Sequence, residues 1–469
     1  MADAFVEGLA ELLGRANVLD DAVEMAPYLT DWRGRFTGRA RAVLRPGSAA
    51  ELSELVARCH AAGVPMVPQG GNTGLCGGAT PRAGGDEVVI SLGRLNRIRE
   101  SDAANNTLVV EAGCTLAAVQ EAAANIDRLF PLSLASEGSC QIGGNLSTNA
   151  GGVHVLRYGN TRDLVLGIEA VLPDGRLWNG LRGLRKDNTG YDLKQLFIGA
   201  EGTLGIITAA VLKLFPRPRS SCVAWVQLDS PALAVELLAH FQATAGNALN
   251  SFELIGRAAL ELVLRHMPGA RAPIDQPGPW AVLVELADGS DEMALRQVME
   301  GALAVAFDTA LIADAVIATT ISQARALWHL RENISEAQRL EGVSIKHDVS
   351  VPVSRIPAFL DSAGEALSDA FPGVRVVAFG HLGDGNLHYN LSKPESDSNT
   401  RFIESTPAVN RIVHDLVASV GGSISAEHGL GQLKRDEILR YRSADETAMM
   451  LAVKQLFDPQ GLMNPGKVI

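Results

Sequence analysis

The first half of the chain carries one helical pattern followed by a series of short apolar runs. In residues 49–62, apolar side chains recur three and four positions apart, behind a Ser-x-x-Glu capping box and ahead of Gly63, so a helix is predicted there. The turn sequence at residues 173–175, Pro-Asp-Gly, predicts a hairpin. Apolar and β-branched runs predict strands at residues 65–68, 87–92, 107–111, 166–172 and 205–214.

The second half alternates the two patterns without the regular strand–helix repeat of a doubly wound parallel sheet, which predicts an α+β fold. The proline-rich stretch at residues 215–219 predicts a rigid linker at a domain boundary. Strands are predicted at residues 223–228, 280–286, 345–351 and 374–379. Helices are predicted at residues 232–244, 291–304, 321–340, 356–370, 408–420 and 446–457.

Composition and charge exclude several classes of protein. Of the 469 residues, 47% are hydrophobic and 20% are charged, as in an ordinary globular protein. The net charge of −12 argues against a general nucleic-acid or anionic-membrane surface. No apolar run is long enough for a transmembrane helix, and the N-terminus lacks the pattern of a signal peptide. The five cysteines are scattered and odd in number, which favours a reducing compartment, and we expect a cytoplasmic protein.

Three glycine-rich segments fall within 140 residues of one another, at Gly70–Gly78, Gly138–Gly152 and Gly199–Gly205. Successive backbone amides of such segments can form a nest for phosphate oxygens. Neither the P-loop pattern nor the strand-to-helix setting of a Rossmann fingerprint is present, so an ordinary nucleotide-triphosphate or nicotinamide site is disfavoured. The segments predict one long phosphorylated ligand threaded between them.

A second cluster combines imidazoles with carboxylate and amide groups around glycines: His381, His388, Asn390, Glu427 and His428. Two imidazoles and a carboxylate are a common ligand set for a catalytic divalent metal with an open position. The alternative is a glycine-rich hairpin whose polar side chains lie in solvent. The site is favoured because no periodic packing pattern accounts for these residues.

Taken in order, these motifs resemble a known flavoprotein family. The segments at residues 68–74, 143–152 and 199–207 resemble the FAD-binding domain of the vanillyl-alcohol-oxidase, or p-cresol-methylhydroxylase, type. Residues 381–388, 426–431 and 464–467 resemble its branch of FAD-linked 2-hydroxy-acid dehydrogenases, which includes enzymes for D-lactate, glycolate and D-2-hydroxyglutarate. The resemblance runs over nearly the whole chain, from residue 44 onward.

The resemblance implies a two-domain α+β fold. Residues 1–216 are expected to form an FAD-binding domain with its core at 44–214, and residues 217–405 a substrate-binding cap domain with an antiparallel sheet. Residues 406–469 are expected to be a C-terminal helical segment that carries Glu427 and His428 back to the FAD domain.

The resemblance also implies which residues contact FAD. Because residues 66–81 contain no histidine, the histidyl tether of some members is absent. Cys76 leaves another covalent link conceivable, but a non-covalent FAD is expected. The expected FAD contacts are Pro68, Gly70, Gly71, Asn72, Thr73, Gly74, Gly78, Gly138, Gly143, Gly144, Thr148, Asn149, Gly151, Gly152, Glu201, Gly205, Ile207 and Asn464.

In the family, His381, His388 and Glu427 match the metal ligands and His428 matches the general base that removes the hydroxyl proton. Zinc suits such a ligand set, with manganese or cobalt as possible substitutes. The alternative for His428 is that it orients Glu427 and takes no proton.

Arg331, Ser335 and Lys346 match the Arg, hydroxyl residue and Lys of the D-2-hydroxyglutarate branch, and the D-lactate and glycolate relatives lack this Lys. Asn390 and His428 are expected as further substrate contacts. Arg331 and Ser335 are four residues apart and are expected on one helical face. The alternative is that Arg331 pairs with Glu332 or Glu336, and Lys346 with Asp348, at the surface.

The favoured reaction is therefore FAD- and metal-dependent oxidation of D-2-hydroxyglutarate to 2-oxoglutarate, with electrons passed to an electron-transfer flavoprotein or a quinone-linked carrier. A flavin dehydrogenase for D-lactate, glycolate or D-malate is a close alternative. A metal-dependent hydrolase with purely structural glycine loops, or a non-redox transferase on the same flavin fold, are alternatives of other classes.

Overall fold

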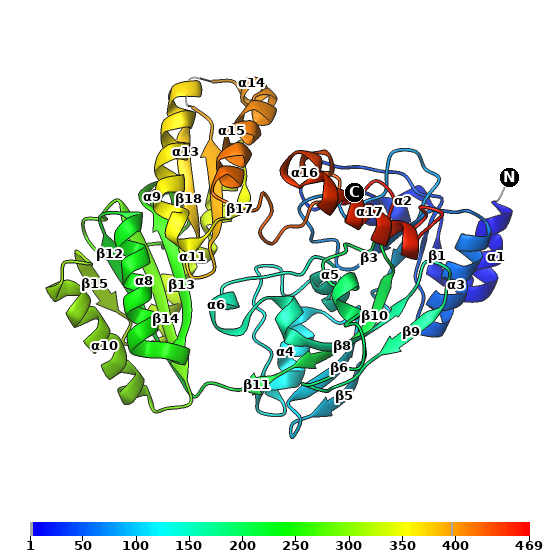
Figure 1. Cartoon of the computed structure of the whole chain (residues 1–469), viewed down its shortest axis with the longest axis horizontal. Coiled ribbons are helices and arrows are strands. Elements are labelled where there is room, and N and C mark those ends of the chain that lie inside the picture. The colour runs from blue at the N-terminus through cyan, green and yellow to red at the C-terminus, as the bar shows by residue number, and fades with distance from the viewer. Residues whose placement is uncertain (1–2, 395–396) are drawn as a thin grey trace. The chain divides into compact units, whose positions relative to one another are not determined.

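The computed structural model describes residues 3–394 and 397–469, which form two compact units of mixed helices and strands (Figure 1). Of the described residues, unit 1 comprises 3–151, 159–217 and 427–469, and unit 2 comprises 152–158, 218–394 and 397–426. The main division falls inside the predicted proline-rich linker. Within the described ranges, no helix combines the length and the apolar character needed to cross a membrane.

Unit 1 contains a four-stranded sheet in the order β1-β2-β4-β3, in which β4 pairs in parallel with both β2 and β3. Its strands are β1 (Val18–Leu19), β2 (Ala42–Leu44), β3 (Met66–Gln69) and β4 (Val88–Ser91). Helices α1 (Ala4–Leu13) and α3 (Ala49–Ala61) pack on it through a shared apolar core, and α2 (Ala22–Leu29) packs against β2. Helix α3 confirms the prediction, because Ser48 Oγ accepts the Glu51 N–H at 3.1 Å and Gly63 follows with a φ of 66°.

The second sheet of unit 1 is antiparallel, in the order β5-β6-β10-β8-β9. The predicted hairpin joins β8 to β9 at Gly175, whose φ is 91°. The strands are β5 (Ile98–Asp102), β6 (Thr107–Glu111), β8 (Val165–Val171), β9 (Leu177–Gly180) and β10 (Ile206–Lys213). A short pair, β7 (Arg128–Leu129) with β11 (Phe215–Pro216), and helices α4 (Leu116–Ala124), α5 (Ile142–Ser147), α7 (Lys194–Phe197), α16 (Arg435–Tyr441) and α17 (Ala444–Phe457) complete the unit.

Unit 2 is built on one antiparallel sheet in the order β15-β12-β14-β13-β18-β19-β16, with β17 also pairing with β19. Helices cover both of its faces: α9, α11 and α12 pack on one face, and α8 and α10 on the other (Figure 1). The strands are β12 (Ser220–Leu228), β13 (Leu249–Gly256), β14 (Trp280–Asp288), β15 (Asp314–Ile317), β16 (Ser344–Ile345), β17 (Asp348–Ser350), β18 (Arg375–His381) and β19 (Asn386–Ser392). The helices are α6 (Val155–Tyr158), α8 (Pro231–Ala245), α9 (Arg257–His266), α10 (Glu292–Asp308), α11 (Ile321–Glu332), α12 (Ile334–Glu341), α13 (Ile356–Ala370), α14 (Asn399–Glu404) and α15 (Thr406–Ser419).

Two predicted elements of unit 2 are interrupted. The helix predicted at residues 321–340 is broken at Asn333, whose side-chain Nδ2 donates to the carbonyl of His329 at 2.8 Å and so competes with the helical pattern. The strand predicted at 345–351 is broken between β16 and β17. There the backbone N–H of His347 donates to Asn390 Oδ1 at 3.1 Å, while the Tyr389 carbonyl accepts from the imidazole of His347 at 2.8 Å. Side chains therefore replace a ladder hydrogen bond.

Strand β13 was not predicted, although it lies at the centre of the sheet between β14 and β18. Its sequence interrupts the apolar run with Asn250, Ser251 and Glu253, all of which are buried. Buried polar residues hide a central strand from a pattern based on hydrophobicity, because the pattern assumes that polar side chains face water.

Candidate functional site

The glycine-rich segments of unit 1 converge on one cavity. About 860 Å³ of space not filled by atoms, its open side included, lies among the loop after β3, helix α5 and the start of β10. Thirteen of the predicted FAD contacts line it: Pro68, Gly70, Gly71, Asn72, Thr73, Gly74, Gly78, Gly143, Gly144, Thr148, Glu201, Gly205 and Ile207.

Other residues line the same cavity without having been predicted as cofactor contacts. Gly202 lies inside the third glycine-rich segment. Several others are immediate neighbours of predicted residues, and the glycine pattern gave no reason to include their apolar or amide side chains. These additional lining residues are Gln69, Cys76, Ala79, Leu92, Gln141, Asn145, Ser147, Gly202, Ile206 and His428. Five predicted contacts lie outside the lining: Gly138, Asn149, Gly151, Gly152 and Asn464.

Glycine is required at two points of the cavity wall because the backbones approach too closely for a side chain. A Cβ at Gly71 would lie 2.1 Å from the carbonyl oxygen of Ser139, and one at Gly143 would lie 2.8 Å from the Cβ of Ala112. At Gly74 and Gly144, by contrast, a Cβ would meet nothing within 4 Å. No Lys or Arg is among the lining residues, so a phosphate there would meet backbone amides of the glycine loops.

Two buried side chains hold the walls of this cavity together. Glu201 accepts the N–H groups of Leu430 at 2.7 Å and Gly431 at 2.9 Å, which fixes the loop that begins with His428. Burial raises the pKa of the Glu201 carboxyl, although these two amides act in the opposite sense. Asn464 Nδ2 donates to the carbonyls of Gly78 at 2.9 Å and Glu201 at 2.7 Å, so this predicted cofactor residue ties the first glycine segment to the third.

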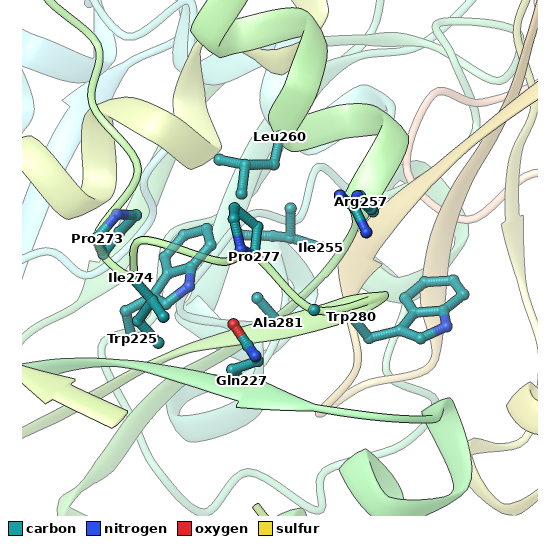
Figure 2. Close-up of a pocket in the computed structure, with 11 residues that line it drawn as sticks. Trp225, Gln227, Ile255, Arg257, Leu260, Pro273, Ile274, Pro277, Trp280 and Ala281 are labelled. Carbon is teal, nitrogen blue, oxygen red and sulfur yellow. The ribbon is translucent and has the colours of Figure 1, made fainter. Parts of the chain in front are cut away.

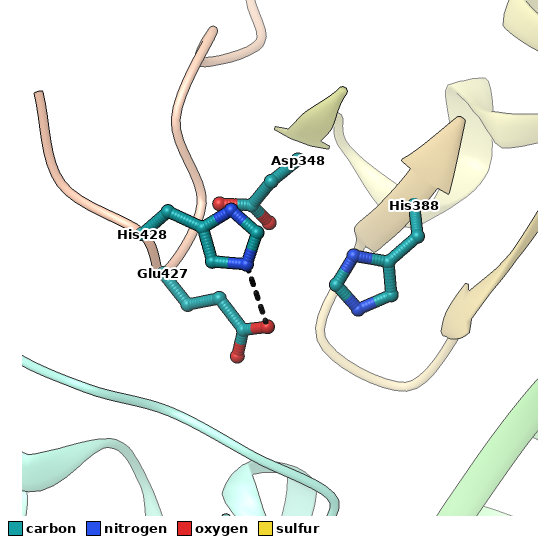
Figure 3. A group of neighbouring side chains, drawn as sticks. All are labelled: Asp348, His388, Glu427 and His428. Carbon is teal, nitrogen blue, oxygen red and sulfur yellow. Dashed lines mark ion pairs between the residues drawn. The ribbon is translucent and has the colours of Figure 1, made fainter. Parts of the chain in front are cut away.

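Four titratable side chains form a second candidate group: Asp348, His388, Glu427 and His428, whose candidate ligand atoms lie within 4.8 Å of one another (Figure 3). Asp348 on β17 stands directly opposite His388 on β19. The carbonyl of Asp348 accepts the N–H of Ala426 at 3.3 Å, and Glu427 and His428 follow Ala426 in the chain. His428 Nε2 lies 3.8 Å from Glu427 Oε1. Imidazole and carboxylate donors of this kind suit zinc, manganese or cobalt.

The predicted metal ligands are divided by this geometry. His388 and Glu427 belong to the group, while His381 lies beside it, with its ring centroid 5.8 Å from that of His388. Asp348 joins the group although the sequence reading considered it only as a partner for Lys346. Its carboxylate accepts from Asn386 Nδ2 at 2.9 Å, which orients it. Asp348 is recognised as a member of the group only from the register between β17 and β19, and the hydrophobic pattern of the sequence does not predict that register.

Arg331, which was predicted to bind substrate, belongs to a buried network of charged side chains with Glu253 and His381. Its Nε donates to Glu253 Oε2 at 2.8 Å, and Glu253 Oε1 accepts from His381 Nδ1 at 2.7 Å. Its guanidinium carbon lies 4.9 Å from the centroid of the Phe379 ring. Burial opposes the ionisation of Glu253, but His381 and Arg331 outweigh it and hold the pKa of this carboxyl below its usual range. The expected alternative, a surface pair with Glu332 or Glu336, is not what Arg331 makes.

The other predicted substrate residues have different surroundings. Ser335 is exposed in α12 while Arg331 is buried in α11, so the two do not share a helical face as expected, because the break at Asn333 separates them. Lys346 is partly buried between β16 and β17. Asn390 is buried, and its amide bonds Gln338 Oε1 at 2.8 Å as well as the backbone of His347.

A second, small cavity lies within unit 2, between β12, β14 and α9 (Figure 2). Tryptophan and proline side chains make up much of its wall, including Trp225, Pro273 and Trp280. Its one charged lining residue, Arg257, pairs with Glu261 at 2.9 Å. None of the predicted site residues lines it.

Comparison with known proteins places the chain in a family. The model described as "FAD linked oxidases, C-terminal domain" matches residues 217–468, and that described as "FAD binding domain" matches residues 40–180. D-2-hydroxyglutarate dehydrogenase of Xanthomonas citri pv. viticola is 40% identical over 100% of this chain and 97% of its own. The mitochondrial enzyme of that name from Arabidopsis thaliana is 39% identical over 98% of this chain and 80% of its own.

Solved structures share the fold at low sequence identity. p-Cresol methylhydroxylase with substrate bound has a TM-score of 0.76 at 16% identity, over 99% of this chain and 96% of that chain. Alkyldihydroxyacetonephosphate synthase has a TM-score of 0.75 at 17% identity, over 99% of this chain and 86% of that chain. The predicted α+β flavoprotein fold is confirmed. The chain therefore belongs to the FAD-linked oxidase family, in its branch of FAD-dependent D-2-hydroxy-acid dehydrogenases.

Proposed function

We propose that this chain oxidises D-2-hydroxyglutarate to 2-oxoglutarate in an FAD- and metal-dependent reaction. Its full-length relatives of that name support the substrate. The observation that carries the proposal is Arg331, whose side chain is 9% exposed. The Nε of Arg331 donates a hydrogen bond to Glu253, and the two Nη groups of Arg331 have no hydrogen-bond partner in the described part of the chain. A buried guanidinium with unused donors favours a substrate that brings a second carboxylate.

The second carboxylate of D-2-hydroxyglutarate favours this substrate over the shorter acids. A five-carbon diacid offers one carboxylate to the reacting end and one to a distant cation, whereas D-lactate presents a methyl group there. Arg331 already pairs with Glu253, but a shorter acid would leave its Nη donors without an acceptor, and unused donors in a buried site cost more than an ordinary hydrogen bond returns, so a site of this kind rejects the shorter acid. We assign the distal carboxylate to Arg331 and Lys346, with Ser335 as a hydroxyl partner and Asn390 as a further contact.

The residues around the reacting C2 of the substrate have two roles, metal binding and removal of the hydroxyl proton. His381, His388 and Glu427 would hold the divalent metal, with zinc favoured, and Asp348 lies where it can contribute a further ligand atom. When bound, FAD supplies the hydride acceptor and the metal supplies a positive charge that favours ionisation of the C2 hydroxyl. His428 takes the hydroxyl proton at an imidazole nitrogen. His428 also lines the glycine-loop cavity, which supports a role close to the flavin.

The FAD site is proposed to be the glycine-loop cavity, with the cofactor bound without a covalent link. Backbone amides of the loop after β3 and of helix α5 would meet the diphosphate, and the open space beside Gly74 and Gly144 supports this. We extend the contacts to the predicted residues outside the lining, Gly138, Asn149, Gly151, Gly152 and Asn464.

Two further parts of the proposal concern the setting of the enzyme. We assign electron transfer from the reduced flavin to an external carrier, an electron-transfer flavoprotein or a quinone-linked acceptor. We assign the chain to the cytoplasm, and its five cysteines, all buried and all free thiols, support a reducing compartment.

An anaerobic reduction experiment tests the proposal. The purified protein, reconstituted with FAD and zinc, is mixed without oxygen with D-2-hydroxyglutarate, D-malate, D-lactate and glycolate. The proposal predicts that D-2-hydroxyglutarate bleaches the flavin absorption with a second-order rate constant of flavin reduction well above that of the other acids. Preferred reduction by D-lactate or glycolate would assign the chain to those relatives, and activity of a flavin-free protein would favour the hydrolase.

A further inference from the structure

One buried carboxylate connects the two ends of the proposed site inside unit 2. Glu253 lies in the middle of β13 and is 1% exposed. Each of its oxygens has a different partner, because Oε1 accepts from His381 Nδ1 at 2.7 Å and Oε2 accepts from Arg331 Nε at 2.8 Å. The predicted metal ligand and the predicted substrate cation are therefore two hydrogen bonds apart.

The surrounding elements fix both partners. Glu253 stands directly opposite His381 in the pairing of β13 with β18, so the strand register sets their separation. Arg331 lies in the last turn of α11, and the ring of Phe379, two residues before His381 on β18, lies under its guanidinium. The orientation of Arg331 is thus determined from two sides, one of them Glu253.

Stability alone gives no reason for this arrangement. A buried ion pair is often no more stabilising than apolar residues of similar volume, since both charges lose their hydration. Burying an acid and an arginine together is therefore better explained by what the two oxygens do to the nitrogens of their partners.

We propose that Glu253 is a positioning residue that fixes the imidazole of His381 and the guanidinium of Arg331 at the spacing that the diacid requires. By accepting a hydrogen bond from Nδ1–H of His381, Glu253 keeps the proton on Nδ1, so that the lone pair of Nε2 can bind a metal. By accepting a hydrogen bond from Nε–H of Arg331, it orients the Nη groups toward the substrate. This inference rests on the proposed function, and it assigns no contact between Glu253 and the substrate.

The substitution Glu253→Gln is the sharpest test. The glutamine side chain keeps the shape of the glutamate, but its single oxygen can accept only one of the two hydrogen bonds. If its NH₂ group faces His381, the imidazole must accept at Nδ1 and carry its proton on Nε2, which blocks the metal. If the NH₂ group faces Arg331, the guanidinium loses its orientation. We expect affinity for Zn²⁺, titrated into FAD-loaded and metal-stripped protein, to fall about 10- to 100-fold. The preference for D-2-hydroxyglutarate over D-lactate, as a ratio of kcat/KM, should fall as well.

Glu285→Gln is the matched control. Glu285 is also a glutamate of this sheet, partly buried on β14, and its Oε2 accepts from Trp328 Nε1 at 3.0 Å, one turn before Arg331 on the same helix. We expect this variant to keep wild-type Zn²⁺ affinity and wild-type substrate preference. Equal changes in both variants, or no change in folded Glu253→Gln, would overturn the inference.

Two measurements keep the test decisive. Should Glu253→Gln fail to fold, Glu253→Asp retains the charge but withdraws the carboxylate by one methylene, and it should also lose Zn²⁺ affinity. In the metal-free wild type, ¹⁵N chemical shifts should give the Nδ1–H form for His381, assigned by comparison with His381→Asn, and an Nε2–H form would overturn the inference. If the wild type does not oxidise the diacid but its Zn²⁺ affinity depends on Glu253, the proposed substrate fails while the positioning of His381 is supported.

Discussion

Replacing Arg331 with methionine separates its contribution to folding from its contribution to substrate choice. Methionine keeps the apolar stem and removes the cation. Glu253 then remains buried with His381 as its hydrogen-bond partner, and the contact with the Phe379 ring loses its charge. The expected result is a loss of stability in unit 2 together with a selective loss of activity on the diacid.

The magnitudes follow from the burial of the pair. Removing one partner of a buried ion pair costs about 3–5 kcal/mol, and we expect the lower value because His381 still bonds Glu253. For a unit of 150–250 residues, about 3 kcal/mol corresponds to a Tm lowered by roughly 6–12 °C. Losing a hydrogen bond to a charged group should reduce kcat/KM for D-2-hydroxyglutarate by about 1.5–3 kcal/mol, or roughly 10- to 150-fold.

Differential scanning calorimetry and kinetics on two substrates check both halves. Glu253→Gln combined with Arg331→Met should recover part of the lost Tm, because the unpaired buried charge is then gone. A Tm lowered by less than about 2 °C would refute the burial argument. An equal loss of kcat/KM on D-lactate would refute a distal-carboxylate contact, since it would mean that Arg331 binds the carboxylate common to both acids. Lys346→Ala would then be the variant that discriminates between them.

Five other variants test the remaining assignments. His428→Ala should slow anaerobic flavin reduction by about 10²–10⁴-fold and leave flavin reoxidation unchanged, as a stopped-flow experiment can measure; an unchanged reduction rate would leave His428 a structural role. His388→Ala and Glu427→Ala should lose bound metal, measured by elemental analysis, while FAD stays bound; normal metal content in both would contradict the ligand set, and Asp348→Asn measures the share of the added carboxylate. Burial raises the pKa of Glu285 to about 7, so the folded protein binds this proton more tightly than the unfolded chain and stability falls as pH rises from about 4.5 through 7. Glu285→Gln should therefore raise the Tm at pH 8 and leave it nearly unchanged at pH 4, and a larger gain at pH 4 would contradict the sign.

Local pattern was sufficient for elements whose signals lie within a few residues. Helix α3 follows from its capping box and apolar spacing, the β8–β9 hairpin follows from Pro-Asp-Gly, and α13 spans the predicted residues 356–370. The glycine segments of the cavity were also recognisable, because a backbone nest needs consecutive small residues. In these cases the chain within one turn or one loop already determines the geometry.

The interruptions at Asn333 and at residues 346–347 depend on side chains that bond to the backbone. The bond from Asn333 to His329 is local, but propensity and spacing do not decide whether it replaces a helical turn. The bond from His347 to Asn390 joins residues 43 positions apart. A hydrogen bond between residues so far apart in the sequence cannot be predicted before the pairing of the strands is known.

The partners of the candidate site were decided by tertiary structure. Glu253 meets His381 because β13 pairs with β18 across 128 residues, and Asp348 meets His388 because β17 pairs with β19. Alternation along a strand tells which face a side chain occupies but not which strand lies beside it. That choice depends on packing of the whole sheet between its helices. The sequence by itself therefore singled out His381, His388 and Arg331 as candidate site residues, while only the fold placed Glu253 against His381 and Arg331 and set Asp348 opposite His388.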